Sequence, residues 1–127
     1  MKIALAVLLS VACLASAAEN KSLTADEVKE LVDKKQNVVY LDVREPRELS
    51  ETGAIKGSVN IPLGQLESRL SELPKDKEIV TICQRGGRAS RAAELLQKNG
   101  FKIAGYCGVL PWKEKNYPLV YPKEQKR

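Results

Sequence analysis

The chain has 127 residues, of which 43% are hydrophobic and 29% charged, and its formal net charge is +5. This length suits one domain, and so small a basic excess, without an aromatic-interleaved basic patch, does not predict nucleic-acid binding. The sequence contains no histidine and only three cysteines, which excludes Ser-His-Asp and Cys-His catalysis, histidine-ligated metals and a structural zinc site.

The first residues, 1–17, have the pattern of a cleaved secretory signal peptide. One lysine precedes the apolar stretch 3–14, and residues 15–17 have the small-x-small pattern of a cleavage site. The stretch is too short to span a bilayer. We therefore expect an exported protein, periplasmic or secreted, without stable membrane insertion after cleavage. Lipidation at Cys13 is a less favoured alternative, because Ser10 stands where a lipoprotein signal carries an aliphatic residue.

The remaining residues, 18–127, are expected to form one domain that ends in a short basic tail. Thr24 and Glu27 form a capping box ahead of the first helix. Apolar patterning then predicts strands at 38–42, 59–61, 78–82 and 102–106, and helical segments at 46–50, 66–73 and 89–99. Alternating strands and helices predict an α/β fold, with a parallel sheet and helices on both faces.

The most informative segment lies between the strand at 78–82 and the helix at 89–99. It begins with Cys83 and continues with Gln84, Arg85, Gly86, Gly87 and Arg88. The carboxyl end of a strand is where open α/β sheets bind ligands, and the helix N-terminus favours a thiolate. The two glycines can adopt positive φ, which lets successive N–H groups converge on one centre. The segment therefore predicts an anion pocket around a nucleophilic sulfur.

Four stretches of the sequence share their order and spacing with a known family. They are residues 40–46, 53–62, 83–88 and 107–112. Together they resemble the single-domain rhodaneses, which are thiosulfate sulfurtransferases. Two positions differ from the usual family pattern, since Ala54 replaces a histidine and Val109 replaces a glycine.

The resemblance implies a rhodanese-like fold with the active loop at the carboxyl end of a central strand. It implies that Cys83 is the catalytic nucleophile and that residues 84–88 bind the substrate. Sulfur would pass from thiosulfate, or a similar small sulfur-containing anion, to Cys83 as a persulfide, and then to a thiol or cyanide. No metal or other cofactor is implied.

Further residues have expected roles around this loop. Asp42 and Arg44 follow the strand at 38–42, and the resemblance implies that they help hold the active loop. Trp112 is expected to pack in the core. Cys107 ends the strand next to that of Cys83, so two roles stay open, an inert buried cysteine or a thiol that resolves Cys83 through a disulfide.

Two other functions remain as alternatives. Phosphatases and arsenate reductases with a similar fold carry the loop motif Cys-x5-Arg. That loop is longer and suits a tetrahedral oxyanion. Cys83 and Arg88 have the spacing Cys-x4-Arg, which disfavours that function. The second alternative is a non-catalytic or redox binding module for an exported thiol protein. The retained cysteine favours sulfur transfer over it.

Overall fold

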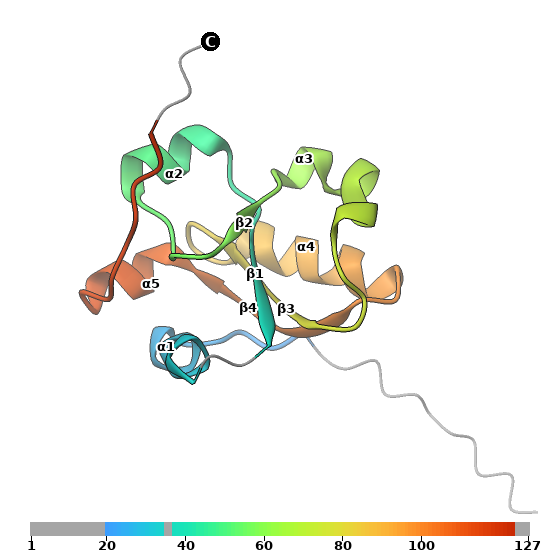
Figure 1. Cartoon of the computed structure of the whole chain (residues 1–127), viewed down its shortest axis with the longest axis horizontal. Coiled ribbons are helices and arrows are strands. Elements are labelled where there is room, and N and C mark those ends of the chain that lie inside the picture. Colours follow the sequence, from blue (N-terminus) through green and yellow to red (C-terminus); the bar gives the residue numbers. More distant parts are fainter. Residues whose placement is uncertain (1–19, 35–36, 124–127) are drawn as a thin grey trace, which may run out of the picture.

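The computed structural model describes residues 20–34 and 37–123. The expected signal peptide, Cys13 and the end of the basic tail lie outside these residues. The described residues form one parallel sheet of four strands in the order β2-β1-β3-β4 (Figure 1). The strands are β1 Val38–Asp42, β2 Val59–Asn60, β3 Glu78–Cys83 and β4 Lys102–Gly108. The helices are α1 Ala25–Asp33, α2 Pro46–Thr52, α3 Leu63–Leu66, α4 Gly87–Lys98 and α5 Val109–Glu114, with a 3-10 helix, η1, at Glu67–Glu72.

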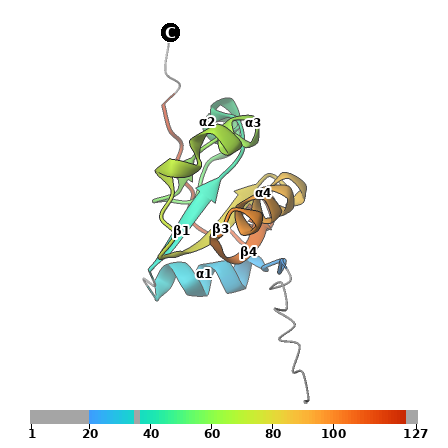
Figure 2. The same cartoon turned by 90° about the vertical axis from the view of Figure 1, so that its right-hand side faces the viewer.

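Helices cover both faces of the sheet, which confirms the expected α/β fold. One core lies under α3, η1 and α4 and includes Leu41, Ile79 and Leu96. The other lies under α1 and α5 and includes Val28 and Trp112. Figure 2 shows α1 on one side of the sheet and α4 on the other. Side chains alternate between the faces of a strand, so β3 contributes to both cores.

Most expected elements are present within two residues of their expected ends. The capping box is formed, since Thr24 Oγ1 accepts from the Glu27 N–H and Glu27 Oε1 accepts from the Thr24 N–H. The segment expected as one helix at 66–73 is instead divided between α3 and η1. Arg69 has φ −122° and ψ 18°, which interrupts the helix. Leu73 is extended, as expected for a residue before proline.

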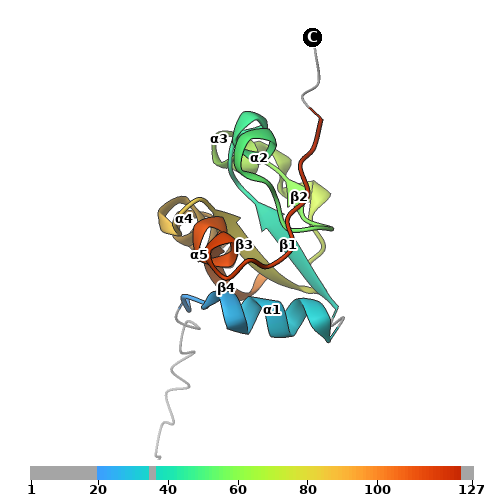
Figure 3. The ribbon, with the colours of Figure 1, turned by 90° about the vertical axis from the view of Figure 1, so that its left-hand side faces the viewer.

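The chain after α5 returns to the opposite edge of the sheet. Figure 3 shows this segment, in dark red, running from α5 past β1 toward β2. Ala54 and Val120 exchange backbone hydrogen bonds of 2.7 and 2.8 Å, and Trp112 Nε1 donates to the Pro118 carbonyl. In the described part of the chain, no helix has the length and apolar character needed to cross a membrane.

Candidate active site

Cys83 lies where a buried strand meets the start of a helix. β3 has five buried residues in succession after Glu78, the last of them Cys83, which is 2% exposed. Thr81, also fully buried, donates from its hydroxyl to the Ala89 carbonyl at 2.7 Å. This hydrogen bond joins β3 to the first turn of α4. The buried strand and this hydrogen bond therefore hold the sulfur between the end of β3 and the N-terminus of α4.

The loop directs a backbone donor at the sulfur. The Gly86 N–H donates to Cys83 Sγ over 2.9 Å. Gly86 has φ +121°, a conformation that L side chains rarely adopt. Gly87 differs from the expectation, since it begins α4 and does not have a positive φ. A Cβ at Gly87 would meet no atom within 4 Å, so open space adjoins the start of α4.

Asp42 and Arg44 form a buried ion pair at the carboxyl end of β1. Both side chains are 0% exposed, and Arg44 Nη2 lies 2.7 Å from Asp42 Oδ2. Arg44 Nη2 also donates to the Gly53 carbonyl at 2.9 Å. The amide of Asn60 donates to the backbone carbonyls of Asp42 and Arg44. These contacts fix the end of β1. Gly53 and Asn60 belong to the 53–62 stretch, but the sequence alone assigns neither of them a role.

Arg44 also contacts the active loop. Its Nη1 donates to Gln84 Oε1 at 3.2 Å and to Thr52 Oγ1 at 2.8 Å. Thr52 Oγ1 in turn lies 3.4 Å from Gln84 Oε1. The side-chain amide of Gln84, expected to bind substrate, is therefore directed at Arg44 and Thr52. In this geometry Gln84 anchors the loop to β1 and α2.

The two loop arginines have different environments. Arg85 is exposed, whereas Arg88 is partly buried and forms a bidentate ion pair with Glu48 of α2. Arg88 Nη1 and Nη2 donate to the two Glu48 oxygens at 2.8 and 2.7 Å. Hydrogen bonding from Arg88 lowers the pKa of Glu48 to about 2. The same hydrogen bond raises the pKa of Arg88, and the negative charges of Cys83 and Asp42 raise it further.

The end of β4 packs directly against the active loop. A Cβ at Gly108 would lie 2.7 Å from the Gln84 carbonyl oxygen, and that oxygen accepts from the Leu110 N–H at 3.1 Å. The ring of Tyr106 would lie 3.9 Å from a Cβ at Gly86. Gly108 was recognised only as part of a motif, because its role depends on a contact between segments distant in sequence.

Cys107 lies on the other face of the sheet from Cys83. The strand register places Cys107 beside Ile82, and Cys83 beside Gly108. Cys83 packs in the core under α4, whereas Cys107 packs in the core with Trp112. Both thiols are free, and burial raises the pKa of Cys107 to about 12. This placement favours an inert Cys107, since a disulfide with Cys83 would require the strand ends to rearrange.

Within residues 20–34 and 37–123, no group of three or more acidic or cysteine side chains is placed to hold a metal ion.

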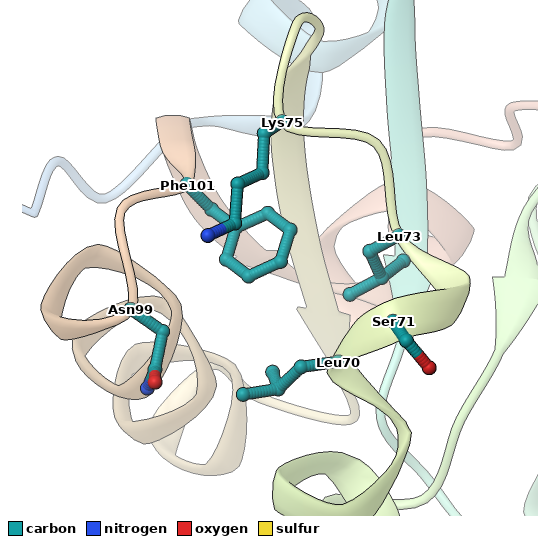
Figure 4. Close-up of a pocket in the computed structure, with 6 residues that line it drawn as sticks. All are labelled: Leu70, Ser71, Leu73, Lys75, Asn99 and Phe101. Carbon is teal, nitrogen blue, oxygen red and sulfur yellow. The ribbon is translucent and has the colours of Figure 1, made fainter.

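A surface hollow of about 390 Å³ lies away from the sulfur (Figure 4). Leu73 and Lys75 of this hollow precede β3 and Phe101 precedes β4. Because the strands are parallel, the hollow lies at the opposite end of the sheet from Cys83.

Comparison with known proteins identifies the family. The pattern of the Rhodanese-like domain matches residues 24–114. The YqhL protein of Bacillus subtilis is 45% identical over 80 residues, covering 63% of this chain and 60% of YqhL, so the match spans less than two thirds of that relative. A sulfurtransferase of Allochromatium vinosum is 29% identical over 92 residues, covering 69% of this chain and 83% of that protein.

A solved structure agrees with these sequence matches. A rhodanese-related protein from Thermoplasma volcanium superimposes with a TM-score of 0.72 at 35% identity, covering 80% of this chain and 99% of that one. The sequence match includes β1, the Cys83 loop and β4. The chain therefore belongs to the rhodanese-like domain family.

Proposed function

We propose that the protein is a sulfurtransferase that carries sulfane sulfur as a persulfide on Cys83. Membership of the rhodanese-like family and a relative named as a sulfurtransferase support this function. The observation that carries the proposal is the 2.9 Å contact from the Gly86 N–H to Cys83 Sγ. A backbone donor aimed at sulfur from a helix N-terminus stabilises the thiolate, which is the reactive form.

The reaction has two steps with thiosulfate as donor. The Cys83 thiolate attacks the outer sulfur, a new S–S bond forms, and the S–S bond of thiosulfate breaks with its electron pair leaving on sulfite. A cyanide ion or a thiolate then attacks the terminal sulfur of the persulfide and regenerates the Cys83 thiolate. Neither step needs a general base, which agrees with a chain that contains no histidine.

The loop provides what this chemistry requires. Cys83 is 2% exposed, so its thiolate and persulfide are shielded from bulk solvent. Arg85 is exposed on the same loop and is available to an anionic donor. The proposal includes no cofactor, and it retains cleavage of residues 1–17 and export, which rest on the sequence pattern alone.

Steady-state kinetics test this function. With thiosulfate and cyanide varied together, we expect a ping-pong pattern of parallel lines in double-reciprocal plots. The Cys83→Ser variant should show no turnover, and Cys107→Ser should turn over normally. Intersecting lines, or activity in Cys83→Ser, would contradict a covalent intermediate on Cys83.

A further inference from the structure

The guanidinium of Arg88 is held by a carboxylate and is not free beside the sulfur. Its Nη1 and Nη2 donate to Oε2 and Oε1 of Glu48 at 2.8 and 2.7 Å. Two parallel N–H groups of arginine are the groups that bind two oxygens of a sulfonate, sulfate or phosphate. Glu48 therefore occupies the part of Arg88 that a tetrahedral oxyanion would use.

Glu48 is set in place by its own helix. It is the third residue of α2, and its Oε2 accepts from the Glu45 N–H at 2.9 Å. The pKa of Glu48 is lowered to about 2, so the carboxylate is charged at neutral pH. Arg88 is the second residue of α4 and stands two residues after Gly86, whose N–H contacts the sulfur. The negative charge of Glu48 therefore lies beside the first turn of α4, next to the active loop.

We propose that Glu48 is a specificity-determining residue, whose carboxylate occupies Arg88 and disfavours doubly charged oxyanion donors relative to singly charged ones. This inference rests on the proposed sulfurtransferase function and adds the donor class that the site selects. Arg85 and the loop N–H groups then meet the charge of the donor. Glu48 acts through Arg88 and through its own charge, without contact with the reacting sulfur.

Two donors that transfer their terminal sulfur by the same reaction, but differ in charge, test the proposal. Thiosulfate carries two negative charges, whereas methanethiosulfonate carries one and has a methyl group in place of an oxygen. Each gives its terminal sulfur to Cys83 by breaking one S–S bond, and the electron pair leaves on sulfite or methanesulfinate. The quantity measured is the ratio of kcat/KM for thiosulfate to kcat/KM for methanethiosulfonate.

Glu48→Gln removes the charge and keeps the length of the side chain and an oxygen for the Glu45 N–H. We expect this ratio to rise by about fivefold or more at low salt, mainly through KM for thiosulfate, and the rise to shrink as salt increases. Glu51→Gln is the matched control, because Glu51 pairs with Arg47 on the same helix at 2.9 Å in an exposed position. It should leave the ratio unchanged.

The outcomes separate this inference from the proposed function. An unchanged ratio in Glu48→Gln, with the persulfide still forming, would overturn the role of Glu48 and leave sulfur transfer intact. An equal rise in Glu51→Gln would overturn it too, because the effect would then be one of overall charge. A wild type that forms no persulfide with either donor would refute both. Glu48→Ala removes the charge with a different side chain and gives the same test if Glu48→Gln folds poorly.

Discussion

Replacing Gly108 by alanine should displace the active loop from the end of β4. The added Cβ would lie 2.7 Å from the Gln84 carbonyl oxygen and 2.8 and 2.9 Å from the carbonyl carbon and Cα of Arg85. These are backbone atoms, so no side-chain rotation relieves the contact, and the loop or the strand must move. Overpacking of this kind costs about 1–3 kcal/mol.

This free-energy cost should lower the melting temperature, and the displaced loop should lower the rate of sulfur transfer. Since about 1 kcal/mol corresponds to roughly 4 °C in the melting temperature of a domain of this size, we expect Tm to fall by roughly 4–12 °C. Sulfur transfer should also be slower than in the wild type, because the N–H of Gly86 moves with the loop and away from the Cys83 sulfur. The control is Gly64→Ala in α3, where an added Cβ meets no atom within 4 Å. Its Tm should be equal or higher, because alanine favours helix.

A Gly108→Ala protein with wild-type Tm and a wild-type rate of sulfur transfer would contradict this close packing. The end of β4 would then have room for a Cβ at position 108 beside the Gln84 carbonyl oxygen. A slower reaction with unchanged Tm would support displacement of the loop but contradict the stability estimate.

Three further predictions concern the charged and thiol groups. Arg44→Met leaves the fully buried Asp42 without its partner and should cost about 3–5 kcal/mol in urea denaturation; an unchanged midpoint would contradict this. Cys107, with its pKa raised to about 12, should resist alkylation in the folded protein, and Cys83 and Cys107 should both remain free thiols after air oxidation; a Cys83–Cys107 disulfide would show that the strand ends rearrange.

The third prediction in this group follows from the pKa of Glu48, which is lowered from 4.5 to about 2. The stabilisation from its ion pair is complete above pH 4.5 and is lost as pH falls toward 2. Allowing for its partial exposure, it amounts to about 1 kcal/mol. Glu48→Gln should flatten this part of the stability profile, and an identical profile in both proteins would argue against the pair.

The strands were predictable because each signal is local. The β-branched runs of β1 and β3 mark buried strands wherever they occur, and the expected bounds 38–42 and 78–82 match Val38–Asp42 and nearly all of Glu78–Cys83. The 66–73 segment was not predictable in detail. Its leucines have helical spacing, but the interruption at Arg69 does not show in an apolar pattern.

Much of the site depends on contacts between distant segments. The sequence singled out Arg88 for its charge, but its partner Glu48 lies 40 residues earlier, and no spacing rule connects them. Likewise the strand register, which places Cys107 beside Ile82, decides which face each cysteine occupies. A one-residue difference in register moves a side chain to the other face of the sheet. Knowing only that the two strand ends are adjacent was therefore not enough to predict how the two thiols lie relative to each other.

The most direct test is the intact mass of the reduced protein, measured before and after thiosulfate and again after cyanide. We predict a gain of one sulfur atom that cyanide removes and that the Cys83→Ser variant never acquires. No gain in the reduced wild type, or the same gain in Cys83→Ser, would contradict a persulfide carried on Cys83.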